Sequence, residues 1–311
     1  MSLFECKYPL CDFEGENVSD FSSHIRGEHA LSEKKYFESY FAKSDLITSE
    51  PIPFKSLEQY VLTDFSNKKN LLLWLKNNKC NAASSYLLDK IKAHSLVKSV
   101  IYFPSSSEIR SVSYLPSIKT YKYFFEDLNA MIDSSGLSRR YDYSLSLNDL
   151  KLKNIQSENV IVDTREQKPI KFKGIGSISE KLDYGDYSFD KILCVERKSL
   201  SDLISTLSSG FERFEREVER CKQANGYLVL VCETSINKFL SFNFSRTGRY
   251  SKASPEFIFH RFRDICKKFP ENLQFCFSGS RSASAELIPF ILSLGIEKAR
   301  QIDFQYLIEN L

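Results

Sequence analysis

Residues 185–202 read GDYSFDKILCVERKSLSD, and this stretch decides the fold of the C-terminal half of the chain. The apolar residues before Glu196 predict a strand, and Asp186 ends the segment that precedes it. Nine residues separate the two acids, which suits neighbouring strands joined by a hairpin near 188–191. Because alternate residues of a strand share a face, Glu196 and Lys198 should point the same way.

The residues around this stretch predict strands alternating with helices from residue 158 onward. Short apolar runs bounded by polar turns indicate strands, and longer runs with a period near 3.6 indicate helices. We expect strands at 160–162, 181–189, 192–195, 227–232 and 273–277, and helices at 199–207, 212–224, 255–269 and 283–294. The predicted fold class is therefore α/β, with a mixed sheet flanked by helices.

Three of the predicted strands end or turn at acidic residues, namely Asp163, Asp186 and Glu196. Carboxylates that converge at strand ends suit Mg²⁺ or Mn²⁺. Hydrolysis of a phosphodiester needs such a cation, an activated water and stabilisation of the leaving oxygen. On the face of Glu196, the Lys198 ammonium would orient the water or hold the phosphate. Arg197 faces the other way, and its guanidinium would organise neighbouring carboxylates.

Two ordered motifs resemble a known family. The run Gly185-Asp186, a spacer, Glu196-Arg197-Lys198, three residues and Asp202 resembles the motif GDX(n)ERKX3D of the XPF/Mus81 structure-specific endonucleases, the ERCC4-type nuclease domain. Upstream, Val162-Asp163-Thr164-Arg165-Glu166 resembles the V-D-x-R-E strand end of that family. The resemblance implies a restriction-endonuclease-like nuclease domain over residues 158–295.

The resemblance also implies roles for individual residues of this chain. Asp186 and Glu196 would bind the metal directly with Asp163 as a further ligand, Lys198 would be the catalytic lysine, and Glu166 would be another acidic member of the site. The other matching residues would orient these groups or contact DNA phosphates. Those expected to orient are Arg165, Arg197 and Asp202, and those expected to contact DNA are Arg165, Arg213 and Arg216.

Residues 1–30 hold two cysteines and two histidines at a spacing typical of zinc sites, namely Cys6, Cys11, His24 and His29. Thiolates and imidazoles suit tetrahedral Zn²⁺, and the twelve intervening residues let a β-hairpin deliver the cysteines while one helical face delivers both histidines. The pattern resembles a C2H2-type zinc finger, which implies a small ββα module with structural zinc. Such a finger contacts nucleic acid, contacts protein or stabilises a terminus, and we favour nucleic acid.

Residues 31–157 carry helical periodicity and no recognisable chemistry. We expect a mainly helical region with helices at 32–42, 57–65, 71–75, 82–91 and 121–132, a loop at 105–107 and a polar linker at 138–157. Trp74 is expected in a core. His94 is isolated from any acidic or cysteine partner, which is typical of an ordinary core or surface histidine. Residues 296–311 are expected to form a C-terminal tail.

The composition indicates a soluble globular protein that stays inside the cell. The formal charge of +3 is only mildly basic, so net charge does not by itself indicate a nucleic-acid partner. No stretch approaches the roughly 18 apolar residues that span a bilayer, and the N-terminus lacks the pattern of a signal peptide. We therefore expect the cytoplasm, or the nucleus of a eukaryotic cell, and no membrane partner.

Together these features predict a metal-dependent DNA endonuclease, with Mg²⁺ or Mn²⁺ as cofactor and DNA as partner. The expected substrates are branched or flapped DNA in repair, recombination or viral genome processing. A homodimer or heterodimer through the nuclease domain is also expected from the resemblance. Two alternatives stay open: a sequence-directed endonuclease of restriction or homing type whose finger reads bases, and a non-catalytic DNA-binding scaffold.

Overall fold

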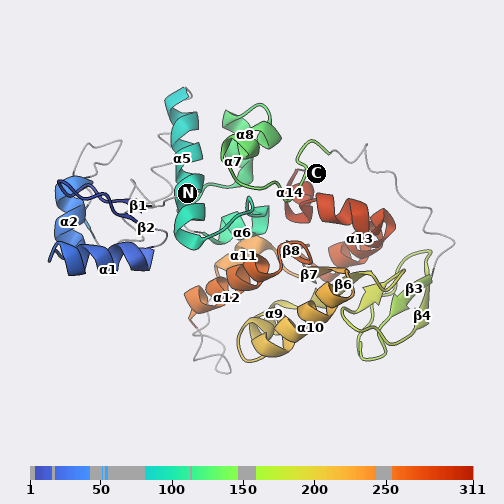
Figure 1. The fold of residues 1–311 in the computed structure, drawn as a ribbon. Coiled ribbons are helices and arrows are strands. Elements are labelled where there is room, and N and C mark those ends of the chain that lie inside the picture. Colours follow the sequence, from blue (N-terminus) through green and yellow to red (C-terminus); the bar gives the residue numbers. More distant parts are fainter. Residues whose placement is uncertain are drawn as a thin grey trace. The chain divides into compact units, whose positions relative to one another are not determined.

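A computed structural model describes residues 4–15, 18–42, 51, 53–54, 81–112, 114–145, 159–242 and 254–310 (Figure 1). The helices expected at 57–65 and 71–75, and Trp74, lie outside these residues. The chain forms two compact units: Met1–Phe103 with Val112–Arg139, and Pro104–Ser111 with Arg140–Leu311. None of the described helices is long and apolar enough to cross a membrane.

The second unit is built on a six-stranded mixed sheet with the order β4-β3-β5-β6-β7-β8 (Figure 1). Its strands are β3 (Asn159–Val162), β4 (Gly176–Ser179), β5 (Tyr187–Ser188), β6 (Leu193–Lys198), β7 (Tyr227–Cys232) and β8 (Leu273–Phe277). β5 is antiparallel to β3 and β6, whereas the other paired strands are parallel. The predicted mixed sheet is confirmed, with its hairpin between β5 and β6.

Helices cover both faces of this sheet. One face packs on α9 (Leu200–Leu207), α10 (Phe211–Gln223), α11 (Ile236–Leu240) and α12 (Pro255–Lys268). The other face packs on α13 (Arg281–Gln301) and α14 (Phe304–Glu309). Every residue of β7 and β8 is buried, because a strand covered on both faces has no solvent side. The unit therefore has three layers, with the sheet in the middle.

Serine side chains define where three of these helices begin. Ser199, Ser254 and Ser280 each accept a hydrogen bond from the amide N–H three residues later, at the starts of α9, α12 and α13. Each bond satisfies one of the amides that the first turn of a helix leaves without a partner. These helices begin within two residues of the predicted bounds.

Residues 296–311 do not form the expected tail. Gly295, with φ of 70°, interrupts α13, but the helix continues to Gln301 and α14 follows. Phe304 is fully buried, and the Asp303 carboxylate accepts hydrogen bonds from the amides of Tyr306 and Ser106. A glycine near a helix end usually marks its stop, so sequence periodicity alone did not reveal the continuation.

Two expectations for the segment before the sheet are wrong. The serines at 105–107 do not form a loop, because α6 (Ser106–Ser111) begins there with its first amide bonded to Asp303. Within the expected linker (138–157), of which residues 146–157 lie outside the described residues, the Arg140 side chain is 5% exposed and Tyr141 is buried. Arg140 Nη1 lies 3.0 Å from Glu108 Oε2 and Arg140 Nη2 donates to the carbonyl of Leu273. Serine-rich composition predicts coil, but these buried contacts determine the structure.

The strand predicted at 181–189 is mostly irregular, since Tyr187–Ser188 alone pairs as β5 within it. In contrast, β4 was not predicted. All four of its residues are exposed and it pairs with one neighbour, β3, at the sheet edge. Without alternation of buried and exposed positions, an edge strand leaves little signal in the sequence.

The first unit begins with the predicted ββα arrangement. An antiparallel pair, β1 (Phe4–Glu5) and β2 (Glu14–Gly15), precedes α1 (Val18–Glu28). The following helix is α2 (Glu33–Tyr40), and farther along the chain lie α5 (Asn81–Lys98), α7 (Ile118–Phe124) and α8 (Leu128–Ser134). The prediction of a mainly helical middle region is confirmed for the described residues.

Within this region the helix expected at 121–132 is in fact two helices. α7 ends at Phe124, and the Asp127 carboxylate then accepts hydrogen bonds from the amides of Asn129 and Ala130, which starts α8. His94 is buried, and its Nδ1 lies 3.0 Å from the hydroxyl oxygen of Tyr114. This placement agrees with an ordinary core histidine.

Gly226, between α10 and β7, packs closely against Tyr184 and Ile192, and a substitution there tests this packing. A Cβ at this position would overlap the Tyr184 hydroxyl and lie 2.8 Å from the carbonyl oxygen of Ile192. Gly226→Ala should therefore lower the free energy of unfolding by about 1–3 kcal/mol, the usual cost of overpacking. Urea denaturation of the whole chain measures this loss.

A double-mutant cycle separates overlap from a general effect of alanine. Tyr184→Phe removes the hydroxyl that the new methyl group would meet, together with its hydrogen bonds to the carbonyls of Lys191 and Ile192. The two substitutions combined should destabilise the protein less than the sum of the single changes. Strictly additive losses would show that Gly226 and Tyr184 do not interact in this way.

Candidate active site

Three acidic residues stand in one row across neighbouring strands. The register pairs Val162 with Tyr187 and Tyr187 with Val195, so the residues beside them, Asp163 and Asp186, continue the row toward Glu196. Backbone hydrogen bonds of 2.9 Å run from Asp163 N to Asp186 O and from Asp186 N to Val195 O. The row lies at the edge where β3, β6, β7 and β8 end and β5 begins.

Glu196 and Lys198 form an ion pair on one face of β6, as predicted from their spacing. The Glu196 side chain is 6% exposed and that of Lys198 17% exposed. Burial, followed by the neighbouring Asp186 carboxylate, raises the pKa of Glu196 to about 8. Burial acts to lower the pKa of Lys198, but the Glu196 carboxylate more than offsets this and the pKa is raised. The lysine therefore keeps its positive charge beside the carboxylates.

Asp186 is the second buried acid of this face. Its carboxylate accepts a hydrogen bond of 2.8 Å from the backbone N–H of Arg197. Burial raises the pKa of Asp186 to about 6, and this hydrogen bond and the Lys198 charge oppose the effect. Two carboxylates with raised pKa values at one sheet edge lack enough positive charge to balance them, which is the condition that a bound cation would relieve.

Asp163 occupies the row but has a different environment from the one expected. Its carboxylate accepts hydrogen bonds from the Arg165 amide, from Arg165 Nε and Nη2, and from the Leu182 amide, at 2.7–3.0 Å. A carboxylate has about four lone-pair sites, and these four bonds use them. Asp163 thus holds Arg165 and the segment before β5, and its expected role as a further metal ligand stays a prediction.

Arg197 lies on the opposite face of β6 among other acids. Its Nη2 lies 3.2 Å from Glu166 Oε1 and its Nη1 lies 3.0 Å from Glu233 Oε1. Arg281 also contacts Glu233, at 3.2 Å. This arrangement fits the expectation that the guanidinium organises neighbouring carboxylates, and it places Glu166 in contact with Arg197 rather than with Glu196. Glu233 was missed by the sequence analysis, although it directly follows the end of β7.

Glu217 of α10 is a second acidic residue that the sequence analysis missed. Its Oε1 accepts a hydrogen bond of 3.0 Å from the backbone N–H of Gly185, the residue before Asp186. Its charge acts on the pKa values of Asp186, Glu196 and Lys198. The one available signal was its position in α10 next to the buried Val218, on the border of the face that packs on the sheet.

The remaining expected residues lie on exposed surface. Asp202 is in the first turn of α9, where its carboxylate accepts a hydrogen bond from the Ser199 hydroxyl, a capping contact. Arg213 and Arg216 are exposed on α10, three residues apart. Arg165 is 59% exposed while it binds Asp163. These positions leave the three arginines open to solvent on the second unit.

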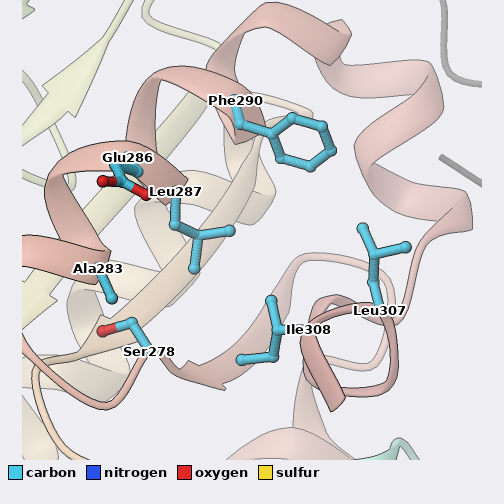
Figure 2. Close-up of a pocket in the computed structure, with 7 residues that line it drawn as sticks. All are labelled: Ser278, Ala283, Glu286, Leu287, Phe290, Leu307 and Ile308. Carbon is cyan, nitrogen blue, oxygen red and sulfur yellow. The ribbon is translucent and has the colours of Figure 1, made fainter. Parts of the chain in front are cut away.

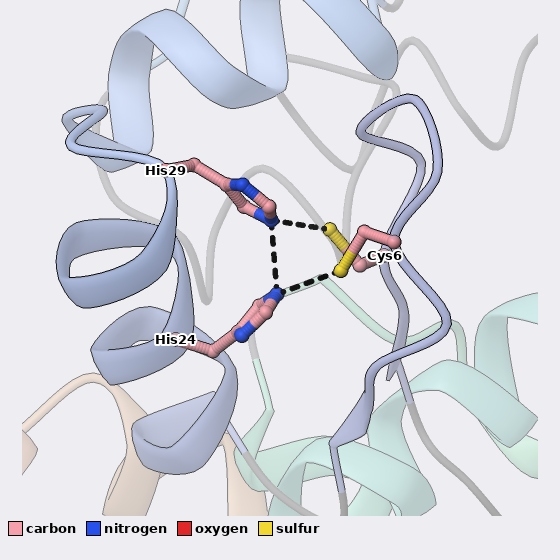
Figure 3. A group of neighbouring side chains, drawn as sticks. Cys6, His24 and His29 are labelled. Carbon is pink, nitrogen blue, oxygen red and sulfur yellow. Dashed lines mark hydrogen bonds between the residues drawn. The ribbon is translucent and has the colours of Figure 1, made fainter.

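The four predicted zinc ligands are brought together in the first unit, and Figure 3 labels three of them, Cys6, His24 and His29. Cys6 Sγ lies 3.3 Å from His29 Nε2, Cys11 Sγ lies 3.3 Å from His24 Nε2, and the two Nε2 atoms are 3.1 Å apart. Within the described ranges, this is the one group of three or more Cys, His, Asp or Glu whose ligand atoms all lie within 4.8 Å of one another.

Tyr36 of α2 contacts this group and was missed by the sequence analysis. Its hydroxyl donates to Cys6 Sγ at 3.3 Å and accepts from the Lys7 amide at 2.7 Å. The side chain is fully buried. No spacing rule points to an aromatic residue seven positions beyond His29, so the packing of α2 on the ββα module could not be anticipated.

A pocket of about 430 Å³ lies elsewhere in the second unit, between α13 and α14 (Figure 2). Leu287 and Phe290 of α13 face Leu307 and Ile308 of α14 across it. Glu286 also lines the pocket. None of the expected site residues lines it, and its apolar walls carry no set of groups for catalysis.

Comparisons with known proteins identify the same region of the chain. The family model described as ERCC4 domain matches residues 162–290. The plant protein described as DNA repair endonuclease UVH1, from Arabidopsis thaliana, is 32% identical over 147 residues, which are 45% of this chain and 15% of that relative. The chain thus spans a small part of the length of this curated relative.

Two solved structures are also similar in part. XPF from Aeropyrum pernix, alone and in complex with DNA, matches with 19% identity and a TM-score of 0.34. Each match covers 44% of this chain, and 66% and 63% of the respective structures. A TM-score this low does not establish a shared fold. The residues that the ERCC4 domain model matches, 162–290, contain the acidic row and the ion pair of β6.

Proposed function

We propose that this chain is a divalent-metal-dependent DNA endonuclease acting on branched or flapped DNA in repair, recombination or viral genome processing. The observation that carries the proposal is the convergence of Asp186, Glu196 and Lys198 at the start of β5 and the end of β6. The family match over residues 162–290 supports it independently. Dimerisation through the nuclease domain and action in a cell nucleus stay predictions.

The donor set of Asp186 and Glu196 fits a hard divalent cation. Both groups offer carboxylate oxygens, which Mg²⁺ and Mn²⁺ prefer over nitrogen or sulfur. When bound, the cation supplies Lewis-acid stabilisation of phosphoryl charge and lowers the pKa of water. Burial of the two acids beside a single lysine leaves a negative balance, which such a cation would neutralise.

The side chains around these ligands then have separate tasks. Lys198, held by Glu196, directs its ammonium at the scissile phosphate or at the attacking water. Arg197 donates its backbone N–H to Asp186 while its guanidinium is held by Glu166 and Glu233. Asp163 fixes the neighbouring strand through Leu182. Such preorganisation reduces the cost of orienting charges during the reaction.

Contacts with DNA are proposed for the exposed arginines of α10. Arg213 and Arg216 lie three residues apart and therefore on one side of the helix. Arg220 continues this side, and its Nε donates to the Asp183 carbonyl at 3.1 Å. Guanidinium groups bind phosphate oxygens without reading sequence. The same helix carries Glu217, which contacts the Gly185 amide, so a DNA-contacting helix borders the acidic site.

Asp186→Ala and Lys198→Ala should each lower the rate of cleavage in magnesium by about 100-fold or more, because each removes a group that stabilises the reaction. Cleavage of labelled splayed-arm, 3′-flap and plain duplex DNA by the full chain measures this effect. Asp264→Ala and Lys267→Ala, at exposed positions of α12, are matched controls that should cleave like the wild type.

The substrate series also separates the proposed function from its alternatives. Preference for splayed or flapped DNA supports recognition of structure, whereas cutting of plain duplex at one sequence supports the sequence-directed alternative. If the wild type binds these DNAs but cuts none in magnesium or manganese, the chain is a non-catalytic scaffold. Cleavage that persists unchanged in both site variants would contradict the assignment of Asp186 and Lys198.

We also propose that Cys6, Cys11, His24 and His29 hold one structural Zn²⁺. Zinc bonds of about 2.3 Å to sulfur and 2.0 Å to nitrogen, at tetrahedral angles, need ligand atoms roughly 3.3–3.8 Å apart. The observed separations of 3.1 and 3.3 Å are close to this range. Phe13 stacks on His24, and Tyr8 on His29, which orients both imidazoles.

The purified full chain should contain about one zinc per molecule by elemental analysis, as expected for a single closed site. Cys11→Ser and His24→Asn should each remove most of this zinc and make the N-terminal 42 residues sensitive to protease, because a finger's folding depends on its metal. His260→Asn, at an exposed position of α12, is the control. A wild-type protein that takes up no stoichiometric zinc would rule out the metal site.

A further inference from the structure

Residues 168–173 (Lys-Pro-Ile-Lys-Phe-Lys), which we name the lysine strap, connect the acidic row to the sheet edge. Ile170 and Phe172 are buried in the core beneath α13, at 6% and 8% exposure. Lys168, Lys171 and Lys173 are exposed. Lys171 and Lys173 alternate with the buried Ile170 and Phe172, so both side chains point away from the core.

The main chain of the strap is held in place by side chains from the site. The Tyr187 hydroxyl accepts the Ile170 N–H at 3.0 Å, and Tyr187 directly follows Asp186. The carbonyl of Lys168 accepts hydrogen bonds from Arg281 Nη2 at 2.6 Å and from Arg197 Nη2 at 3.3 Å. The strap is therefore anchored to the residues that surround the acidic row.

The strap adds positive charge near Arg197, on the face of the sheet opposite Glu196 and Lys198. Three of its six residues are lysines and none is acidic, whereas the whole chain of 311 residues carries only +3. None of the three forms an ion pair with another residue that the structure describes. The adjacent acid, Glu166, is bound by Arg197 instead. The ammonium groups are consequently available to an anion from outside the protein.

We propose that the lysine strap is a contact surface for the sugar-phosphate backbone of DNA, and this rests on the proposed nuclease function. Lys171 and Lys173 are two residues apart and both exposed, so they reach neighbouring anionic groups. Lysine binds phosphate as a point charge and carries no base specificity. The strap thus binds the backbone near the end of β3, on the opposite face of the sheet from Glu196 and Lys198, whatever the local sequence.

The test measures DNA binding without cleavage. Fluorescence anisotropy with labelled splayed-arm DNA is recorded for the full chain carrying Asp186→Ala, over a series of salt concentrations. Adding Lys171→Glu with Lys173→Glu should weaken binding roughly ten-fold or more at low salt, and should reduce the slope of log affinity against log salt by about 2. Lys171→Arg with Lys173→Arg keeps the charges and should retain the parent affinity and slope.

A matched control distinguishes local contact from a change in net charge. Lys267→Glu with Lys298→Glu makes the same charge change in the last turns of α12 and α13, and it should leave the salt slope unchanged. Thermal melting checks that all variants are folded. Equal losses in the strap and control variants, or no loss in either, would overturn the strap as a contact surface.

These outcomes are separable from failure of the proposed function. If the wild type cleaves DNA and the strap variant binds like its parent, the strap proposal is wrong and the nuclease proposal stands. If the wild type neither binds nor cleaves any DNA of the series, both proposals fall. Loss of affinity and slope in the strap variant alone supports both.

Discussion

Backbone hydrogen bonds across β3, β5 and β6 place Asp163, Asp186 and Glu196 side by side, and the chemistry of the second unit depends on this register. Carboxylates at such close quarters disfavour their own ionisation. Each of the three carboxylates has a different partner that offsets its negative charge. Asp163 is neutralised by Arg165, Glu196 pairs with Lys198, and Asp186 accepts a backbone N–H while it keeps a raised pKa. A register shift of one residue in any of these strands would move its acidic side chain to the opposite face of the sheet, and the three carboxylates would no longer lie side by side.

Much of this arrangement could be predicted because it is local in sequence. Glu196 and Lys198 share a face through the period of a strand, and the distance from Asp186 to Glu196 suits a hairpin, as β5 and β6 confirm. Helix starts were predictable where a serine caps them, as at Ser199 and Ser254. The Cys and His residues of the first unit meet because a short hairpin holds the cysteines, while His24 lies in α1 and His29 directly follows its end.

The rest depends on contacts between distant parts of the chain. Glu217 reaches Gly185 only because α10 packs on the sheet beside β5, and Tyr36 reaches Cys6 only because α2 folds over the ββα module. The contacts of Asp163 could not be predicted for a related reason. Its position at a strand end was predictable, but the four donors that fill its oxygens come from the turn that follows and from Leu182, nineteen residues on. Periodicity carries no information about such partners.

The charges of the second unit present a physical problem that any DNA-cleaving site with buried acids must solve. The carboxylates needed to hold a cation also repel the phosphate that must approach it. Screening weakens this repulsion at a distance but acts less on groups that are partly buried. Cations beside the acids, rather than a high net charge, are then the effective remedy, since they attract the backbone at close range without making the whole protein basic. Lysines at 168, 171 and 173 and arginines at 213 and 216 supply such charges from two separate segments, while the whole chain carries only +3. The weak net charge, which does not by itself indicate a nucleic-acid partner, is therefore compatible with the proposed one, because residues 168–173 carry three lysines and no acidic residue.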